Sequence, residues 1–254
     1  LAVLESLAAT DDGATLSELA ATMALPMPTV HRLLATLAHQ GFVETGANGA
    51  WRIGVNAFRT GSAFLGHRNL VAQALPRLDA LMRQSGETAN LAVIDAGEAV
   101  FVAQSPCREL MRMSAKLGAR APLHASGVGK AMLAGMDDDA CAFALGARPM
   151  AKFTAQTIVT AERLRDDLAS ARRRGYAIDD EEHALGLRCV AAAIYDESAR
   201  PWAALSLAGP TSRLTASRVE QLGPHVGNAA RDITRALGGM APAAPGRPVS
   251  GYER

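Results

Sequence analysis

The chain has 254 residues, 49% of them hydrophobic, and a formal net charge of +1. This length and apolar content can bury a substantial core, and the length fits two small domains better than one large one. No apolar run approaches the roughly 18 to 20 residues that span a bilayer, and no charged-then-apolar leader opens the chain. We therefore exclude a membrane-spanning protein and expect a soluble, cytoplasmic one.

The cysteine pattern bears on metals and redox chemistry. Cys107, Cys141 and Cys189 lie far apart and form no CxxC pair. This spacing argues against a disulfide framework and against a structural zinc site. A metal site built from His124, His183 and Cys189 has no ligand spacing to support it. We expect no metal and no cofactor.

The first two predicted helices are short. The sequence LAVLESLAA opens the chain inside a helix. Thr15 with Glu18 has the capping-box spacing, which predicts the start of a helix over 16–24. We expect Leu16, Leu19 and Met23 of this helix to face inward.

A longer helix is predicted over 25–41, in the sequence LPMPTVHRLLATLAHQG. Val30, Leu33, Leu34 and Leu37 recur at the helical period and predict its buried stripe. Pro28 fits the first turn, where the missing N–H would be unpaired in any case. The other face carries short polar groups around one guanidinium, which can reach base edges and phosphates. Its residues are Thr29, His31, Arg32, Ala35, Thr36 and His39.

Two short strand patterns follow this helix. FVE at 42–44 and WRI at 51–53 flank the turn-rich TGANGA, as in a small β-hairpin. Two short helices and a hairpin predict a winged helix-turn-helix domain over 1–54, whose second helix enters the DNA major groove. A helical hairpin in an ordinary core is the alternative. The residues expected at the DNA are Met27, Thr29, Val30, His31, Arg32, Thr36 and Arg52.

The charge of this part of the chain does not favour DNA binding. Residues 1–68 carry four basic and five acidic groups, a net charge of −1. Many DNA-binding domains have a basic excess, because neutralising phosphates drives affinity. Either the few arginines are well placed and doubled by dimerisation, or basic residues lie upstream of Leu1.

A helical segment over 55–84 is predicted to link the two domains. Gly66 offers a break and Pro76 a kink. The apolar residues are too many for a solvent-exposed linker, so the segment should pack against another element. They include Phe58, Phe64, Leu65, Leu70, Leu75, Leu78 and Leu81. A core helix of one large domain is the alternative.

The pattern over 85–239 predicts an α+β domain. TANLAVI and AVFVAQS form a hairpin, LMRMSAKLG a third strand, and CVAAAIYD and PWAALSLAG another strand pair. Helices are expected from Lys130 onward, over 161–174 after the cap Thr160, and over 216–237 after the cap Thr215. Pro224 should kink or split the last helix. The Pro- and Gly-rich segment 240–254 is expected to be disordered.

The loop HASGVGK at 124–130 leads directly into a helix. Its small residues let the backbone approach a ligand, and the amides of Gly127 and Val128 at the helix N-terminus suit a carboxylate. A P-loop is excluded, because the position five before Gly129 is His124 and Ala131 replaces the Ser or Thr that holds magnesium. The alternative is a helix start whose amides are capped by Ser126.

Four carboxylates follow one another at 179–182. A run of like charges is usually a solvated loop, and we expect this of Asp180, Glu181 and Glu182.

Three blocks of sequence carry a family resemblance: TLSELAATMALPMPTVHRLLATLAHQGFVE at 15–44, GARAPLHASGVGKAMLA from Gly118 and GYAIDDEEHALGLRCVAAAIYDE from Gly175. In these blocks, in their order and in their separation, the chain resembles the IclR family of bacterial transcriptional regulators. The resemblance covers about 1–239. It implies a GAF/PAS-like antiparallel sheet in the C-terminal domain and a segment at 55–84 that connects the domains and helps to pair subunits.

The resemblance also implies an effector pocket in the C-terminal domain. Two backbone amides and a serine hydroxyl suit a small carboxylic or 2-oxo acid. Asp179 would repel a second anion, so we expect it to meet a hydroxyl or hydrated carbonyl, or to hold its loop. Some family members have Ser at the position of Ala208, so a slightly larger or less polar acid should fit here. The implied positions are Leu110, Met113, Gly127, Val128, Asp179, Cys189 and Ser206.

Together these features predict a ligand-responsive, DNA-binding transcriptional regulator, preferably a repressor. Its expected partners are operator DNA, a small organic acid and a second copy of the chain, with tetramers left open, because helix-turn-helix proteins usually read paired half-sites. One alternative is a hydrolase that uses Cys189 or Ser126 with His124 or His183 as base, although no nucleophile elbow or cysteine-protease signature surrounds them. A redox switch at Cys189 is another.

Overall fold

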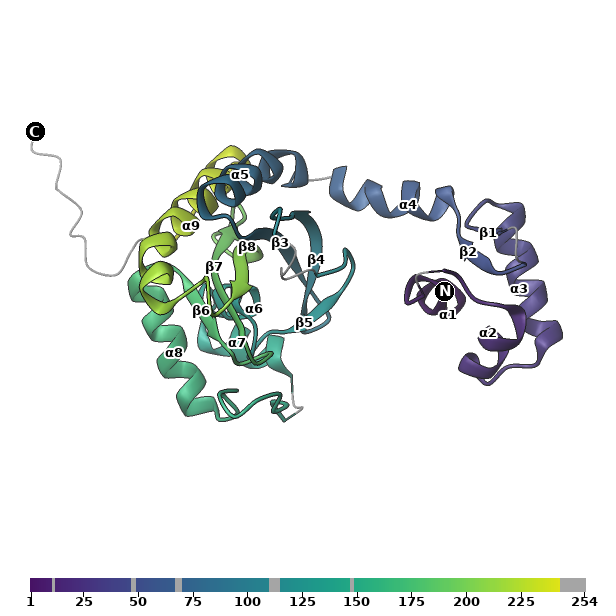
Figure 1. The fold of residues 1–254 in the computed structure, drawn as a ribbon, viewed down its shortest axis with the longest axis horizontal. Helices are drawn as coiled ribbons and strands as arrows, with labels where there is room; N and C mark the ends of the chain where they lie inside the picture. Colours follow the sequence, from purple (N-terminus) through teal and green to yellow (C-terminus); the bar gives the residue numbers. More distant parts are fainter. Residues whose placement is uncertain (11, 47–48, 67–69, 110–114, 147–148, 243–254) are drawn as a thin grey trace, which may run out of the picture. The chain divides into compact units, whose positions relative to one another are not determined.

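The computed structural model describes residues 1–10, 12–46, 49–66, 70–109, 115–146 and 149–242 (Figure 1). The chain divides into two compact units, Leu1–Arg68 and Asn69–Arg254. The first unit contains helices and a two-stranded hairpin, in the order α1(Ala2–Ala8), α2(Leu16–Met23), α3(Met27–His39), β1(Val43–Thr45), β2(Trp51–Ile53) and α4(Val55–Gly66). It is the predicted winged helix-turn-helix domain.

Local signals set the helix boundaries in the first unit. The Thr15 hydroxyl accepts a hydrogen bond from the Glu18 amide, and the Glu18 carboxylate accepts one from the Thr15 amide, so the capping box is complete. Helix α2 ends at Met23, and its C-cap residue Ala24 adopts the left-handed conformation. Helix α3 then begins with Pro28 in its first turn, as predicted.

The core of the first unit confirms most of the predicted stripe of α3. Val30 and Leu34 are fully buried, and Leu37 packs against them at the edge of the core. Leu33 was expected in the same stripe, but 41% of it is exposed. The buried stripe is centred on positions 30, 34 and 37, which follow one another at the spacing i, i+4, i+7. Leu33 lies at the edge of this stripe, where the core no longer covers it.

The predicted linker over 55–84 is two helices with different surroundings. Helix α4 ends at Gly66 and belongs to the first unit. Helix α5(Leu70–Ser85) belongs to the second unit, because it buries Leu70, Leu78 and Leu81 in that unit's core and runs through Pro76 without ending. The division at 68–69 therefore differs from the predicted boundaries at 54 and 84.

The second unit is built on a six-stranded sheet in the order β5-β4-β3-β8-β7-β6, with every neighbouring pair antiparallel. This confirms the expected α+β class and the two predicted strand pairs. The strands are β3(Thr88–Asp95), β4(Glu98–Ser105), β5(Arg120–Pro122), β6(Ala177–Asp180), β7(Leu187–Tyr195) and β8(Pro201–Pro210).

Two strands differ from the predictions. The strand expected over 110–118 includes residues 110–114, which lie outside the described residues; the strand that pairs with β4 is β5, two residues further on. Strand β6 was not predicted, because its short AIDD sequence begins the run of carboxylates that we interpreted as a loop. It pairs with β7 at the edge of the sheet and carries Asp179.

Helices cover both faces of the sheet (Figure 1). Helices α5 and α9(Ala216–Ala236) bury one face, and α6(Gly127–Ala134), α7(Asp138–Leu145) and α8(Ala161–Arg174) lie on the other. The predicted caps Thr160 and Thr215 start α8 and α9. Helix α9 is a single helix through Pro224 and is not split there. Within the described ranges, no helix is both long and apolar enough to cross a membrane.

Candidate DNA interface and effector site

The outward face of α3 presents the predicted polar residues. His31, Arg32 and Thr36 are exposed, Thr29 is half-buried, and half of Met27 is exposed. The Thr36 hydroxyl donates to the carbonyl of Arg32 at 2.9 Å, so it can still accept a hydrogen bond. A solvent-open hollow is lined by Leu16, Met27, Pro28, His31 and Arg32. These groups have the accessibility that contact with base edges requires.

One predicted DNA contact is wrong. Val30 is completely buried and packs in the core of the first unit, so its side chain cannot reach DNA. Its spacing already places it in the apolar stripe of α3 together with Leu34.

Arg52 lies in the wing. It is exposed on β2, and its Nε donates to the carbonyl of Asp12 at 3.0 Å. This bond ties the hairpin to the loop between α1 and α2, and it leaves the guanidinium at the surface where a phosphate contact is geometrically accessible.

In the second unit, the register of the sheet brings the distant polar positions together. Asp179 of β6 lies opposite Cys189 of β7, which lies opposite Ala208 of β8. Two residues further along, Ala191 lies opposite Ser206, and Ser206 lies opposite Asn90 of β3. Residues opposite one another, and residues two apart in a strand, share a face of the sheet. Asp179, Cys189 and Ser206 are therefore neighbours on one buried face.

The N-terminus of α6 lies over this face. A Cβ added to Gly127 would lie 3.0 Å from the Cβ of Cys189 and 3.5 Å from that of Ala191, so the helix backbone approaches the sheet closely. Ser126 caps the helix by accepting from the Gly129 amide at 3.2 Å. The amides of Gly127 and Val128 belong to the first turn, where backbone N–H groups have no partner within the helix. The cap and the carboxylate site are thus compatible.

Replacing Gly129 by Ala should destabilise this arrangement. The new Cβ would lie 2.4 Å from Leu123 Cα and 2.5 Å from the Leu123 carbonyl oxygen, and these backbone atoms cannot move independently. We expect a loss of about 1–3 kcal/mol or more in the free energy of unfolding, measured by urea titration with circular dichroism. The control is Gly61→Ala in α4, where a Cβ meets nothing within 4 Å and helix propensity predicts a slight gain. An unshifted midpoint for Gly129→Ala would contradict this packing.

Asp179 is almost completely buried and holds the loop after β6. Its Oδ1 accepts hydrogen bonds from the amides of Glu182 at 2.9 Å and His183 at 3.4 Å. Burial raises the pKa of Asp179 to about 6, although these amides and the charge of Lys130 act in the opposite direction. Burial and the neighbouring Asp179 carboxylate raise the pKa of the Cys189 thiol well above its usual value.

The interpretation of Glu182 as part of a solvated loop is wrong. Its carboxylate is buried and bonds the ammonium of Lys130, whose side chain is itself only 1% exposed. Lys130 Nζ also pairs with Asp167 of α8 at 2.9 Å. Asp180 is exposed and Glu181 is half-buried. A carboxylate in a run of four is buried here because a cation 52 residues away in the sequence meets it.

Two predicted wall residues, Leu110 and Met113, lie outside the described residues. Beside the site, three rings join its two loops: His124 stacks on Phe153 with ring centroids 6.0 Å apart, and Phe153 meets the edge of His183 at 5.3 Å. Thr154 and Thr157 donate to the carbonyls of Glu181 and Glu182. These contacts fix the loop that carries the Asp179 hydrogen-bond donors.

The contacts of the candidate nucleophiles do not favour a hydrolase. The Ser126 hydroxyl donates to the Pro122 carbonyl at 2.7 Å, and His124 Nε2 lies 2.9 Å from the Ala151 carbonyl oxygen. The bonds described for Ser126 and His124 therefore go to the backbone and not to each other. A buried thiol with a raised pKa, as at Cys189, is a poor nucleophile.

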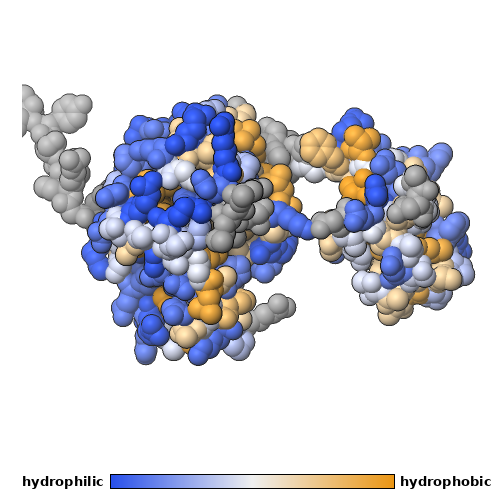
Figure 2. Space-filling model, in the orientation of Figure 1, coloured by the Kyte–Doolittle hydropathy of each residue, from blue (hydrophilic) through white to orange (hydrophobic). Residues whose placement is uncertain are grey.

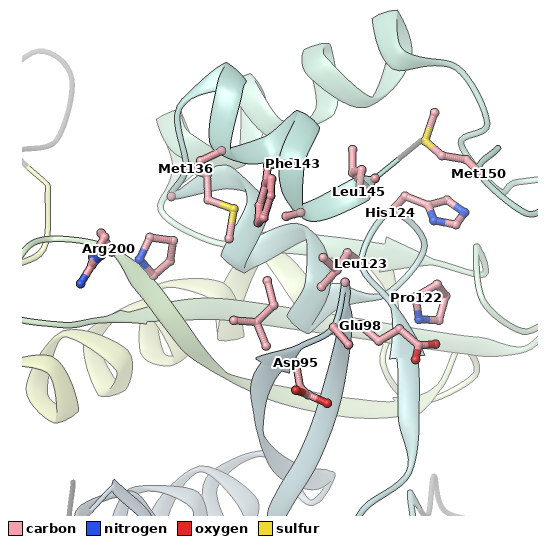
Figure 3. A pocket seen from close by; sticks show the side chains of 18 of the residues that line it. Asp95, Glu98, Pro122, Leu123, His124, Met136, Phe143, Leu145, Met150 and Arg200 are labelled. Atoms are coloured by element: carbon pink, nitrogen blue, oxygen red, sulfur yellow. The ribbon is translucent and has the colours of Figure 1, made fainter. Parts of the chain in front are cut away.

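A separate cleft of about 1160 Å³ lies between the β3–β4 turn and the α6–α7 region. Figure 3 shows Phe143, Met136 and Leu145 on its helical side and Asp95 and Glu98 on the strands. Of the predicted effector residues that the structure describes, none lines it. Because its polar groups do not converge on one point and Arg120 already pairs with both carboxylates, we do not assign the effector to this cleft.

Comparison with known families matches both units. The model of the IclR helix-turn-helix domain matches residues 1–47, and the model described as bacterial transcriptional regulator IclR C-terminal matches residues 62–235. The chain belongs to the IclR family. This confirms the resemblance seen in the sequence, and the family is one of DNA-binding transcriptional regulators.

Named relatives of this IclR-family chain are repressors. It is 48% identical to the acetate operon repressor of Salmonella typhimurium over 94% of the chain and 88% of the relative. It is 48% identical to the transcriptional repressor IclR of Escherichia coli, over 94% of the chain and 89% of the relative. It is 39% identical to the transcriptional repressor AllR of Escherichia coli, over 94% and 88%.

Solved structures share the fold. The IclR of Thermotoga maritima superposes with a TM-score of 0.78 at 26% identity, covering 93% of this chain and 96% of that one. An IclR homologue from Microbacterium hydrocarbonoxydans, complexed with 4-hydroxybenzoate, superposes with a TM-score of 0.81 at 28% identity, covering 92% and 95%.

Proposed function

We propose that this IclR-family chain is a cytoplasmic DNA-binding repressor, not an enzyme, and that its second unit binds a small carboxylic or 2-oxo acid that changes its affinity for operator DNA. The observation that carries the proposal is the position of the α6 N-terminus over the buried Asp179, Cys189 and Ser206. It is supported by the repressor names of the relatives and by the acid bound to the Microbacterium homologue.

The proposed site suits a small acid that carries a second polar group next to its carboxylate. The Gly127 and Val128 amides at the positive end of α6 and the Ser206 hydroxyl supply donors to a carboxylate. Asn90, opposite Ser206, accepts from the Gln104 amide at 2.8 Å and can donate through its own amide group. Ala208 and Cys189 lie opposite each other and form the adjoining wall of the site. This wall is weakly polar, and the Cys189 sulfur makes it polarizable.

The proposed repressor acts as a homodimer, with a tetramer as the further option. Two-fold pairing lets two α3 helices read half-sites about one helical turn or a multiple of it apart. Figure 2 shows hydrophobic side chains on the surface of α4, where Val55 is 67% and Phe58 72% exposed. Exposed apolar groups of this kind mark a surface that another chain can cover. The acid shifts DNA affinity only by as much as it prefers one arrangement of the dimer.

The test is fluorescence anisotropy of the purified protein with DNA from immediately upstream of its own gene, at fixed salt, with and without acids. Acetate, pyruvate and 4-hydroxybenzoate form the panel, and their neutral amides serve as matched controls. We expect specific binding and a several-fold shift with at least one acid but with none of the amides. The Ser206→Ala variant should bind the same DNA and respond less, because one donor is removed.

The outcomes separate the parts of the proposal. Specific DNA binding without a response to any acid contradicts the effector assignment. Acid binding in calorimetry without specific DNA binding contradicts the repressor assignment.

A further inference from the structure

Asp179 places a carboxylate in the same buried site that, under the proposed function, receives the carboxylate of an acid. We propose that the second unit takes up one proton for each acid molecule it binds, and that Asp179 carries this proton. This inference rests on the proposed function and adds to it a requirement that the family assignment does not supply.

Asp179 is held on one side by the loop, and its backbone donors all bond the same oxygen. Oδ1 accepts from the amides of Glu182 and His183, which fixes the plane and the position of the carboxyl group. Asp179 is 1% exposed, so water does not screen its charge. The Asp179 carboxyl group also shares a hydrogen bond with the thiol of Cys189, which lies opposite it in the register, and Cys189 is the residue over which Gly127 lies.

The charges around Asp179 are already balanced by one another. From α6, the Lys130 ammonium pairs with Glu182 of the loop and with Asp167 of α8, and Arg174 of α8 lies 3.8 Å from Asp167. These four groups, two cations and two anions, cancel.

The remaining titratable neighbours add no cation. Asp180, the next residue on β6, pairs with Arg188 of β7 at 2.6 Å. Burial lowers the pKa of His183, which therefore stays neutral at pH 7. The Cys189 thiol keeps its proton because its pKa is raised. Within the described part of the second unit, Asp179 thus has no cation of its own to offset an incoming anion.

Two adjacent carboxylates in a buried site cannot both stay ionised at low cost. Burial already brings the pKa of Asp179 to about 6, so protonation near neutral pH costs little, and a second anion raises the pKa further. A protonated second oxygen would donate to the acid while Oδ1 keeps its two amide donors. An O–H···O⁻ bond of this kind is short and strong.

Binding of the acid should weaken as the pH rises. Above about pH 6 the empty site holds an ionised Asp179, so binding must take a proton from solution. The apparent affinity for the acid then falls by up to tenfold for each pH unit of increase, because one proton is bound with the ligand. Below about pH 6 the proton is already present, and the dependence flattens.

The experiment is calorimetric titration of the full chain with pyruvate and with 4-hydroxybenzoate at pH 7.5, in phosphate and in Tris, two buffers with different heats of ionisation. The wild-type chain should show an uptake approaching one proton per acid bound, and its affinity should rise about tenfold from pH 7.5 to 6.5. Asp179→Asn keeps an oxygen for both amides and should bind the acids with no proton uptake and little pH dependence. Asp180→Asn, one residue away and exposed, should behave like the wild type.

Pyruvamide and 4-hydroxybenzamide, which carry no charge, should bind much more weakly than the acids, and whatever binding calorimetry detects should occur without proton uptake. Acid binding by the wild type without proton uptake overturns the proposal and leaves Asp179 facing a neutral group of the ligand. Equal proton uptake by Asp179→Asn also overturns it, since another group then carries the proton. If neither acid binds in either buffer, the proposed function itself fails and the proton-coupled binding with it.

Discussion

Replacing Lys130 by Met is expected to lower the free energy of unfolding of the second unit by about 3–5 kcal/mol. The ammonium is 1% exposed and pairs with Glu182, whose side chain is 7% exposed. The other oxygen of Glu182, Oε2, has no hydrogen-bond partner among the described residues, so loss of Lys130 leaves a buried carboxylate with nothing to stabilise its charge. Asp167, 24% exposed, is solvated in part and adds less.

The two tryptophans allow the second unit to be measured by itself. Trp202 lies in β8, and Trp51 lies in the first unit, so a Trp51→Phe background makes fluorescence report on the second unit during urea unfolding. Arg120→Met is the matched control, because it removes a cation from an exposed pair with Asp95 and Glu98 and should cost less than about 1 kcal/mol.

A double variant identifies the cause of the loss. If the unpaired charge is responsible, Lys130→Met combined with Glu182→Gln should recover more than half of the lost stability, because no buried charge then lacks a partner. Equal losses in the single and double variants would show that packing around the Lys130 stem matters more than charge. A loss no larger than that of Arg120→Met would contradict the buried pair.

Lys130 also joins the parts of the candidate effector site. It lies in α6, three residues after Gly127, and its partner Glu182 donates through its amide to Asp179. One ion pair therefore fixes the distance between the helix N-terminus and the carboxylate below it. Pre-positioned groups of this kind reduce the ordering that a ligand must cause when it binds.

The first unit could be predicted almost completely because its signals are local. The capping box at Thr15, the proline at position 28 and the apolar period of α3 each lie within one or two helical turns. The errors in α3 concern the edge of the stripe: Leu33 is more exposed than its spacing suggested, and Val30 cannot both fill the core and touch DNA. The spacing of apolar residues in a helix shows which side of the helix faces the core. It does not show how far around the helix the core extends.

The effector site depended more on contacts distant in sequence. The approach of Gly127 to Cys189 and the register that puts Ser206 beside it belong to the sheet and α6 together, and the sequence alone supplied them only through the family resemblance. The role of Glu182 was missed because a run of carboxylates is usually solvated, which holds here for the exposed Asp180 and in part for the half-buried Glu181. A usable signal was the lysine in GVGKAMLA: a charged residue inside an apolar helix requires a buried partner.

Arg32→Ala is expected to weaken specific operator binding by about a hundredfold or more. A bidentate contact between an arginine and a base contributes about 1–3 kcal/mol, and a dimer makes the contact in both half-sites. Arg32 is exposed on α3, so its removal should leave the stability and the acid binding of the chain unchanged. Anisotropy titrations with operator and with scrambled DNA of equal length, at one salt concentration, measure the ratio of the two affinities.

Arg59→Ala is the matched control for Arg32. Arg59 is an exposed cation of the same unit, on α4, where its guanidinium donates to Asn56. Losing it should change the affinities for operator and scrambled DNA by the same small factor, because a phosphate contact carries no sequence information. If Arg32→Ala also lowers both affinities equally, Arg32 contacts only the phosphate backbone, and the sequence must be read by other groups on the face of α3, with the exposed His31 and Thr36 the next to replace. Unchanged operator affinity would contradict the placement of α3 in the major groove.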